Sequence, residues 1–136
     1  MLKIKTSGTP FERGLQHGKC CKDIAWRWIE HSFKELTEGF KVSQASDVVR
    51  QNVSKLNGWR NQWEATDPDG IDECCGIAKG LGMDEETFFL LQFKARLVKS
   101  FNACTIAAFR DDQGQVIIGK TDDLNNSGVG CNILQE

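Results

Sequence analysis

Residues 9–40, TPFERGLQHGKCCKDIAWRWIEHSFKELTEGF, predict one long helix near the start of the chain. Thr9 is a suitable N-cap, and Pro10 fits the first helical position, where its missing N–H is not needed. Apolar residues then recur at helical spacing: Ala25, Trp28, Ile29, Phe33, Leu36 and Phe40. The helix therefore has one apolar face that is expected to pack against other elements.

Three more helices are expected before residue 100. The second opens at Ser46-Asp47. The third opens at Asp67-Pro68 and stops at Gly80 and Gly82. The fourth begins at Asp84, and its acidic first turn suits the helix dipole. One face of the second is lined by Val49, Val53, Leu56, Trp59 and Trp63, and one face of the fourth by Phe88, Leu91, Ala95 and Val98. These faces are large and apolar, so they need cover.

Strand patterns occur only near the two ends of the chain. Leu2 to Thr6 alternates between apolar and polar residues, and the apolar runs 105–109 and 116–118 flank a turn signal, so we expect a short strand and a β-hairpin. The fold class is therefore α+β, mostly helical up to residue 100 and then a β-hairpin. One strand and one hairpin make a poor sheet, so we expect residues 1–136 to be a single, incomplete domain.

Composition excludes several classes of function. The chain has 136 residues, about one domain's worth, with a net charge of -2 and scattered Lys and Arg, so a nucleic-acid partner is not expected. No apolar run approaches the roughly 18 residues of a membrane span, and no signal peptide is evident. We expect a cytoplasmic protein without membrane association.

Cysteine spacing argues against disulfides and against a metal. Four of the six cysteines form the adjacent pairs Cys20-Cys21 and Cys74-Cys75, which are strained for bridging and lack the Cys-x-x-Cys spacing of zinc sites. Reduced thiols, no metal and no cofactor are expected.

The segment with a chemical pattern is residues 104–124, CTIAAFRDDQGQVIIGKTDDL. Antiparallel strands lie about 5 Å apart, so a hairpin here lets Lys120 and Asp123 approach Cys104. If the Ala103–Cys104 bond were cut, the new α-amino group, with an ordinary pKa of about 7.7–8.0, would suit a general base for the thiol. Asp123 would orient that amine, and Lys120 would favour the thiolate.

This segment resembles the nucleophile region of the choloylglycine hydrolase group, in which Cys-Thr, a strand, Asp-Asp-Gln-Gly, a second strand and Gly-Arg-x-x-Asp follow one another. Two earlier blocks, residues 8–18 (GTPFERGLQHG) and 76–80 (GIAKG), resemble the acyl-coenzyme A:6-aminopenicillanic acid acyltransferase family. The three blocks together span nearly the whole chain.

The resemblance implies the N-terminal part of a four-layered αββα N-terminal-nucleophile hydrolase sandwich that cleaves itself before Cys104. Residues 1–103 would be the helical pro-segment, or α subunit, and residues 104–136 the start of the β subunit. Cys104 would be the nucleophile and Asp123 its supporting carboxylate. Lys120 stands where the hydrolases have an arginine, and Ala103 where the acyltransferase has a glycine.

The resemblance also implies an autoproteolytic cysteine acyltransferase or amidohydrolase that acts on amide or thioester acyl groups of a small molecule. Family members continue well past residue 136, so we expect this chain to be truncated, inactive alone, and associated with a second subunit or with itself. Two alternatives stay open: a non-catalytic remnant that acts by association, and a bile-salt or N-acyl-amine hydrolase. For His17, close packing beside Gly14 and Gly18 is favoured over proton transfer.

Overall fold

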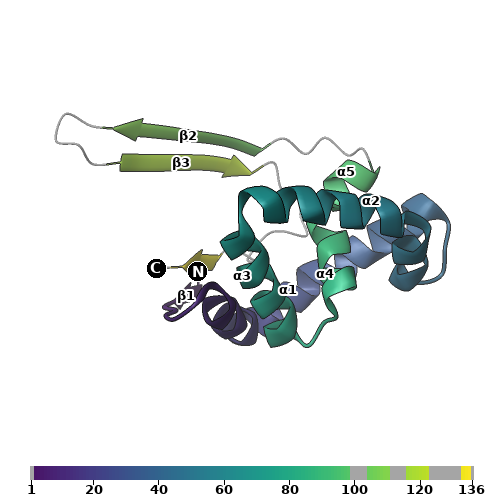
Figure 1. The fold of residues 1–136 in the computed structure, drawn as a ribbon, viewed down its shortest axis with the longest axis horizontal. Coiled ribbons are helices and arrows are strands. Elements are labelled where there is room, and N and C mark those ends of the chain that lie inside the picture. The colour runs from purple at the N-terminus through teal and green to yellow at the C-terminus, as the bar shows by residue number, and fades with distance from the viewer. Residues whose placement is uncertain (1, 99–103, 111–115, 123–132, 136) are drawn as a thin grey trace.

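The computed structural model describes residues 2–98, 104–110, 116–122 and 133–135, with side chains described for residues 3–98. Most of the described chain is helical (Figure 1). The elements in order are β1 (Leu2–Ile4), α1 (Pro10–Phe40), α2 (Ala45–Thr66), α3 (Pro68–Leu81), α4 (Glu85–Gln92), α5 (Lys94–Val98), β2 (Cys104–Arg110), β3 (Val116–Asp122) and β4 (Ile133–Gln135).

The expected start and end of α1 are confirmed. Thr9 Oγ1 accepts a hydrogen bond from the Glu12 backbone N–H at 3.3 Å, and Glu12 Oε2 accepts one from the Thr9 N–H at 2.8 Å. This capping box satisfies two amides that would otherwise lack partners. The helix ends where Lys41 adopts a left-handed conformation with φ 54°, so the reversal falls on a lysine rather than on the nearby Gly39.

Short polar caps also open α3 and α4. Asp67 Oδ1 accepts from the Gly70 N–H at 2.9 Å to open α3, and Asp84 Oδ1 accepts from the Thr87 N–H at 2.8 Å to open α4. Gly82, with φ 77°, ends α3. The prediction of one continuous fourth helix is wrong, because the chain leaves helical geometry at Phe93 (φ -97°, ψ 7°) and resumes as α5.

Helices α1 and α3 pack side by side through four glycines. A Cβ placed on Gly80 would lie 2.6 Å from the Leu15 carbonyl oxygen and 2.7 Å from the Lys19 amide nitrogen. Each of the partner glycines, at positions 14, 18 and 76, would likewise bring a Cβ closer than 3.0 Å to backbone atoms of the other helix. The two backbones therefore touch directly, and no side chain larger than hydrogen fits between them.

A second layer of contacts closes the helical core. Helix α4 is buried from Phe88 to Leu91, and its Phe89 ring stacks on Phe93 at 6.2 Å and meets Trp63 edge-on at 6.3 Å. The core residues are Ile29, Leu36, Val48, Val49, Leu56, Ile71, Ala78, Leu81, Phe88, Phe89, Leu90, Leu91 and Phe93. Val53 was expected in this core but is 42% exposed, and Val48 is buried in its place.

The expected need for a covering sheet is wrong. Phe88 and Leu91 are only 5% and 4% exposed, and both belong to a core cluster whose described members come from α1 to α4 and the α4–α5 junction. The apolar faces of α1 to α4 are mutually complementary, so the helices cover one another.

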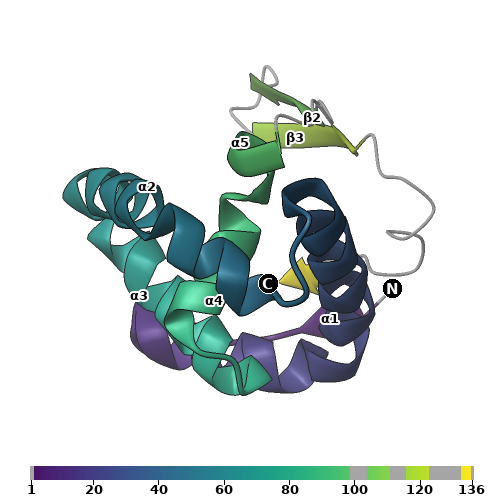
Figure 2. The same cartoon turned by 90° about the vertical axis from the view of Figure 1, so that its right-hand side faces the viewer.

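The strands form two separate ladders. β2 pairs with β3 in antiparallel register, and β1 pairs with β4 in parallel, which brings the two ends of the described chain side by side (Figure 1). In both views the β2–β3 ladder lies to one side of the helices rather than between them (Figure 2).

The α+β fold class and the αββα sandwich are therefore corrected. The described part of the chain is a predominantly helical assembly whose strands make only two-stranded ladders. Helices pack on helices, because burial within the helical layer already removes their apolar faces from water. Within the described residues, no helix combines the length and the apolar character needed to cross a membrane.

Candidate functional site

The register of the β2–β3 ladder places part of the expected site. Cys104 is the first residue of β2 and lies opposite Asp122, and Lys120 lies opposite Ile106. Ala103 and Asp123 fall outside the described residues. The ladder thus brings positions 104 and 120 close together, but it does not test the assignment of Asp123.

The same register identifies a carboxylate that sequence reasoning missed. Positions directly opposite in an antiparallel pair are about 4.5–5.5 Å apart, and diagonal positions about 7–8 Å apart. Asp122 is opposite Cys104, and Lys120 is its diagonal neighbour on the same face. The sequence signal was not sufficient, because counting back from a turn at 111–114 pairs Cys104 with Thr121, one residue away from the observed partner.

Three of the other thiols are poorly suited to nucleophilic attack. Burial raises the pKa of the Cys74 and Cys75 thiols to about 11, and it also raises the pKa of Cys21. A thiol must be deprotonated to attack a carbonyl. These cysteines therefore stay protonated at neutral pH and act as small core residues, as Cys21, only 2% exposed, does.

The two glycine-containing blocks meet in space but do not form a catalytic cluster. Residues 8–18 begin α1 and residues 76–80 belong to α3, and their glycines make the backbone contact described above. Arg13 on α1 also forms an ion pair with Glu73 on α3, 3.3 Å long. These blocks hold two helices together.

His17 lies between Gly14 and Gly18 on α1. Its Nδ1 atom is buried and has no hydrogen-bond partner among the described residues. The preference for close packing over proton transfer at this histidine stays a prediction.

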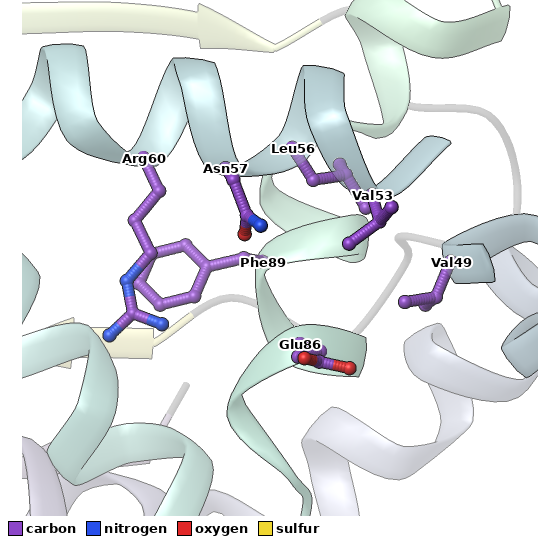
Figure 3. Close-up of a pocket in the computed structure, with 7 residues that line it drawn as sticks. All are labelled: Val49, Val53, Leu56, Asn57, Arg60, Glu86 and Phe89. Carbon is purple, nitrogen blue, oxygen red and sulfur yellow. The ribbon is translucent and has the colours of Figure 1, made fainter. Parts of the chain in front are cut away.

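One pocket between α2 and α4 is too small for a substrate. Arg60, Phe89 and Glu86 line it together with apolar residues of α2 (Figure 3). The Arg60 guanidinium lies 4.6 Å from the centre of the Phe89 ring and 2.8 Å from Glu85 Oε2. The cavity volume is about 20 Å³, which is enough for a single water.

A larger groove lies where α2 meets the α4–α5 junction. It has a volume of about 440 Å³ and is lined by Trp59, Gln62, Trp63, Thr66, Gln92, Phe93 and Arg96. We call it the tryptophan groove. Sequence reasoning assigned Trp59 and Trp63 to the core, and both are only partly buried. The chain breaks at Phe93, and Arg96 beyond the break lies 5.6 Å from the Trp59 ring of α2.

Within residues 3–98, no group of three or more His, Cys, Asp or Glu side chains is arranged to hold a metal ion. No protein-family model matches the chain.

Proposed function

We propose that this chain carries the nucleophile of a cysteine acyltransferase or amidohydrolase that is activated by cleavage before Cys104. The observation that carries the proposal is the β2–β3 register, which sets Cys104 opposite Asp122 and diagonal to Lys120. A cysteine position opposite an aspartate and diagonal to a lysine suits an activated thiol, which needs a nearby cation or base. The resemblance of residues 104–124 to nucleophile segments supports the same reading.

Self-cleavage begins with the Cys104 thiolate. Its sulfur attacks the Ala103 carbonyl, the amide nitrogen of Cys104 is protonated and leaves, and a thioester forms. Water then hydrolyses the thioester, which frees the carboxylate of Ala103 and the thiol and α-amino group of Cys104. The new amine has an ordinary pKa of about 7.7–8.0 and suits general-base work at neutral pH.

Turnover uses the freed amine and thiol together. The amine takes the thiol proton, the sulfur attacks the substrate's amide or thioester carbonyl, and the amine protonates the leaving group. Water or an acceptor amine then attacks the acyl-enzyme and releases the thiol. Lys120 stabilises the thiolate by charge, and Asp122 or Asp123 orients the ammonium group.

Intact-mass spectrometry of the natural protein tests this proposal. We expect two polypeptides, the second beginning at Cys104, that stay associated as subunits in the cytoplasm. Cys104→Ala should leave one chain without turnover, while Cys20→Ala should be cleaved normally, because Cys20 is an exposed residue of α1. Cleavage that persists in Cys104→Ala would refute the proposal.

A second candidate function is a non-catalytic module that acts by association. The apolar faces of α1 to α4 bury one another, so this helical layer forms without any contribution from the proposed reaction. If the Cys104→Ala variant stays uncleaved and still performs the biological function of the unmodified protein, the non-catalytic module is favoured over the enzyme. If the protein is an enzyme, the ratio of acyl groups passed to water to those passed to an amine separates an N-acyl-amine hydrolase from a transferase.

A further inference from the structure

The tryptophan groove has the walls of a site for a flat ring. Trp59 and Trp63 come from α2 and Phe93 from the α4–α5 junction, and the Phe93 ring lies 5.5 Å from Trp59 and 6.2 Å from Trp63. All three line a space of about 440 Å³, within the range of roughly 300–1,000 Å³ typical of small-molecule sites. Aromatic walls of this kind favour stacked or edge-on contacts with another ring.

One end of the groove carries a cation without an acidic partner in the described part of the chain. Arg96 is exposed, and its guanidinium lies 5.6 Å from the Trp59 ring and 5.9 Å from the Phe93 ring. The interhelical cations elsewhere are paired with carboxylates: Arg13 with Glu73, Arg60 with Glu85, and Lys94 with Glu35. Arg96 is instead held over two rings, with its planar fork available to a carboxylate.

The neighbouring polar groups give the two ends of the groove opposite charge. At Trp63, the indole N–H donates to Asp67 Oδ2 at 3.4 Å, so a carboxylate lies beside that tryptophan. Asp67 repels an anionic group there, whereas Arg96 attracts one. The amides of Gln62 and Gln92 lie along the lining and offer hydrogen bonds without a net charge.

We propose that the tryptophan groove binds a flat aryl carboxylate, with its ring against Trp59 and Trp63 and its carboxylate on Arg96. The proposal concerns binding and does not depend on Cys104 being a nucleophile. Charge complementarity selects the anion, and the aromatic walls select a planar hydrophobic body over a compact ion.

NMR titration of the full chain with 2-naphthoate tests this. The four tryptophan indole N–H signals report separately: Trp59 and Trp63 should shift, while Trp26, whose N–H donates to the Leu81 carbonyl, and Trp28 on α1 serve as internal controls. Neutral 2-naphthamide should bind about tenfold more weakly, as should 2-naphthoate to Arg96→Gln, because a charge-assisted hydrogen bond is lost.

Arg27→Gln removes one exposed arginine from α1 and is the matched control, which should bind 2-naphthoate as the unmodified chain does. Three results would overturn the proposal. They are equal shifts at all four tryptophans, equal affinity of Arg96→Gln and the unmodified chain, and shifts at Trp59 and Trp63 that follow protein concentration without ligand. The last would show that a second copy of the chain covers the groove.

Discussion

Replacing Gly80 by alanine tests the direct backbone contact between α1 and α3. A methyl group there would lie 2.6 Å from the Leu15 carbonyl oxygen and 2.7 Å from the Lys19 amide nitrogen, whereas ordinary contact begins near 3.4 Å. The α1 and α3 backbones must therefore separate locally by about 0.8 Å, the difference between 3.4 and 2.6 Å. The obstructing atoms are backbone rather than the far end of a flexible side chain, so a rotamer change cannot relieve the clash.

Two opposing effects decide the magnitude. Overpacking a well-packed contact typically costs about 1–3 kcal/mol, while Gly→Ala in a helix gains about 1 kcal/mol at most. Backbone obstruction places the cost near the top of its range, so the net loss should be about 2 kcal/mol. For a domain of this size, that loss lowers the melting temperature by roughly 7 °C.

Gly58→Ala is the matched control. Gly58 lies inside α2, and a Cβ there would meet no atom within 4 Å. The same chemical change should therefore stabilise the protein by about 0.5–1 kcal/mol, through lower backbone entropy in the unfolded state. Urea unfolding followed by far-ultraviolet circular dichroism measures both. If Gly80→Ala stabilised the protein as Gly58→Ala does, α1 and α3 would not be in direct backbone contact.

Two further predictions concern titratable groups. With iodoacetamide at pH 8, peptide mapping should show that exposed Cys20 is alkylated at least tenfold faster than Cys74 and Cys75. The thiols of Cys74 and Cys75 have a pKa of about 11, so only roughly one in a thousand is ionised at this pH. Equal alkylation rates would contradict the burial of that pair. Lys94 donates a 2.5 Å hydrogen bond to Glu35 Oε2 and lowers the pKa of Glu35 below 4.5. The stabilisation from this pair is therefore complete at a pH above the pKa that Glu35 has in the unfolded chain. It is lost as the pH falls through the pKa that Glu35 has in the folded protein. Lys94→Met should therefore lower the urea midpoint at neutral pH and flatten its fall on acidification, modestly because Glu35 is partly solvated; parallel curves for the two proteins would show that the pair contributes nothing.

Helix positions were predictable because their signals are local. Thr9, Asp67 and Asp84 cap helices with their own side chains, and Gly82 ends α3 with a conformation that glycine adopts without strain. None of these features needs knowledge of the tertiary structure. The left-handed Lys41 was not predictable, because this helix-end conformation usually falls on glycine or asparagine. The break at Phe93 was not predictable either, because no glycine or proline marks it.

The fold class failed for a different reason. An apolar face shows that a helix is covered but does not show what covers it. The presence of a hairpin suggested a sheet, yet in the described part of the chain the core is built from α1 to α4 and the α4–α5 junction. Helix-on-helix and helix-on-sheet packing require the same periodicity, so the sequence pattern does not separate them.

The two glycine blocks show which conclusions a resemblance of motifs supports and which it does not. Residues 8–18 and 76–80 are far apart in sequence, and the structure gives them one shared role, the α1–α3 contact. Similarity in those blocks is therefore evidence for a shared way of packing two helices, and it carries no information about a reaction. Only the segment that begins at Cys104 bears on the proposed chemistry, and there the decisive feature is the pairing register.

Because that register sets Asp122 opposite Cys104, substituting Asp122 and Asp123 separately by asparagine tests which of the two carboxylates the Cys104 thiol depends on. Loss of cleavage in Asp122→Asn alone would assign the role to the cross-strand partner, and loss in Asp123→Asn alone would assign it to the residue that the family pattern selects.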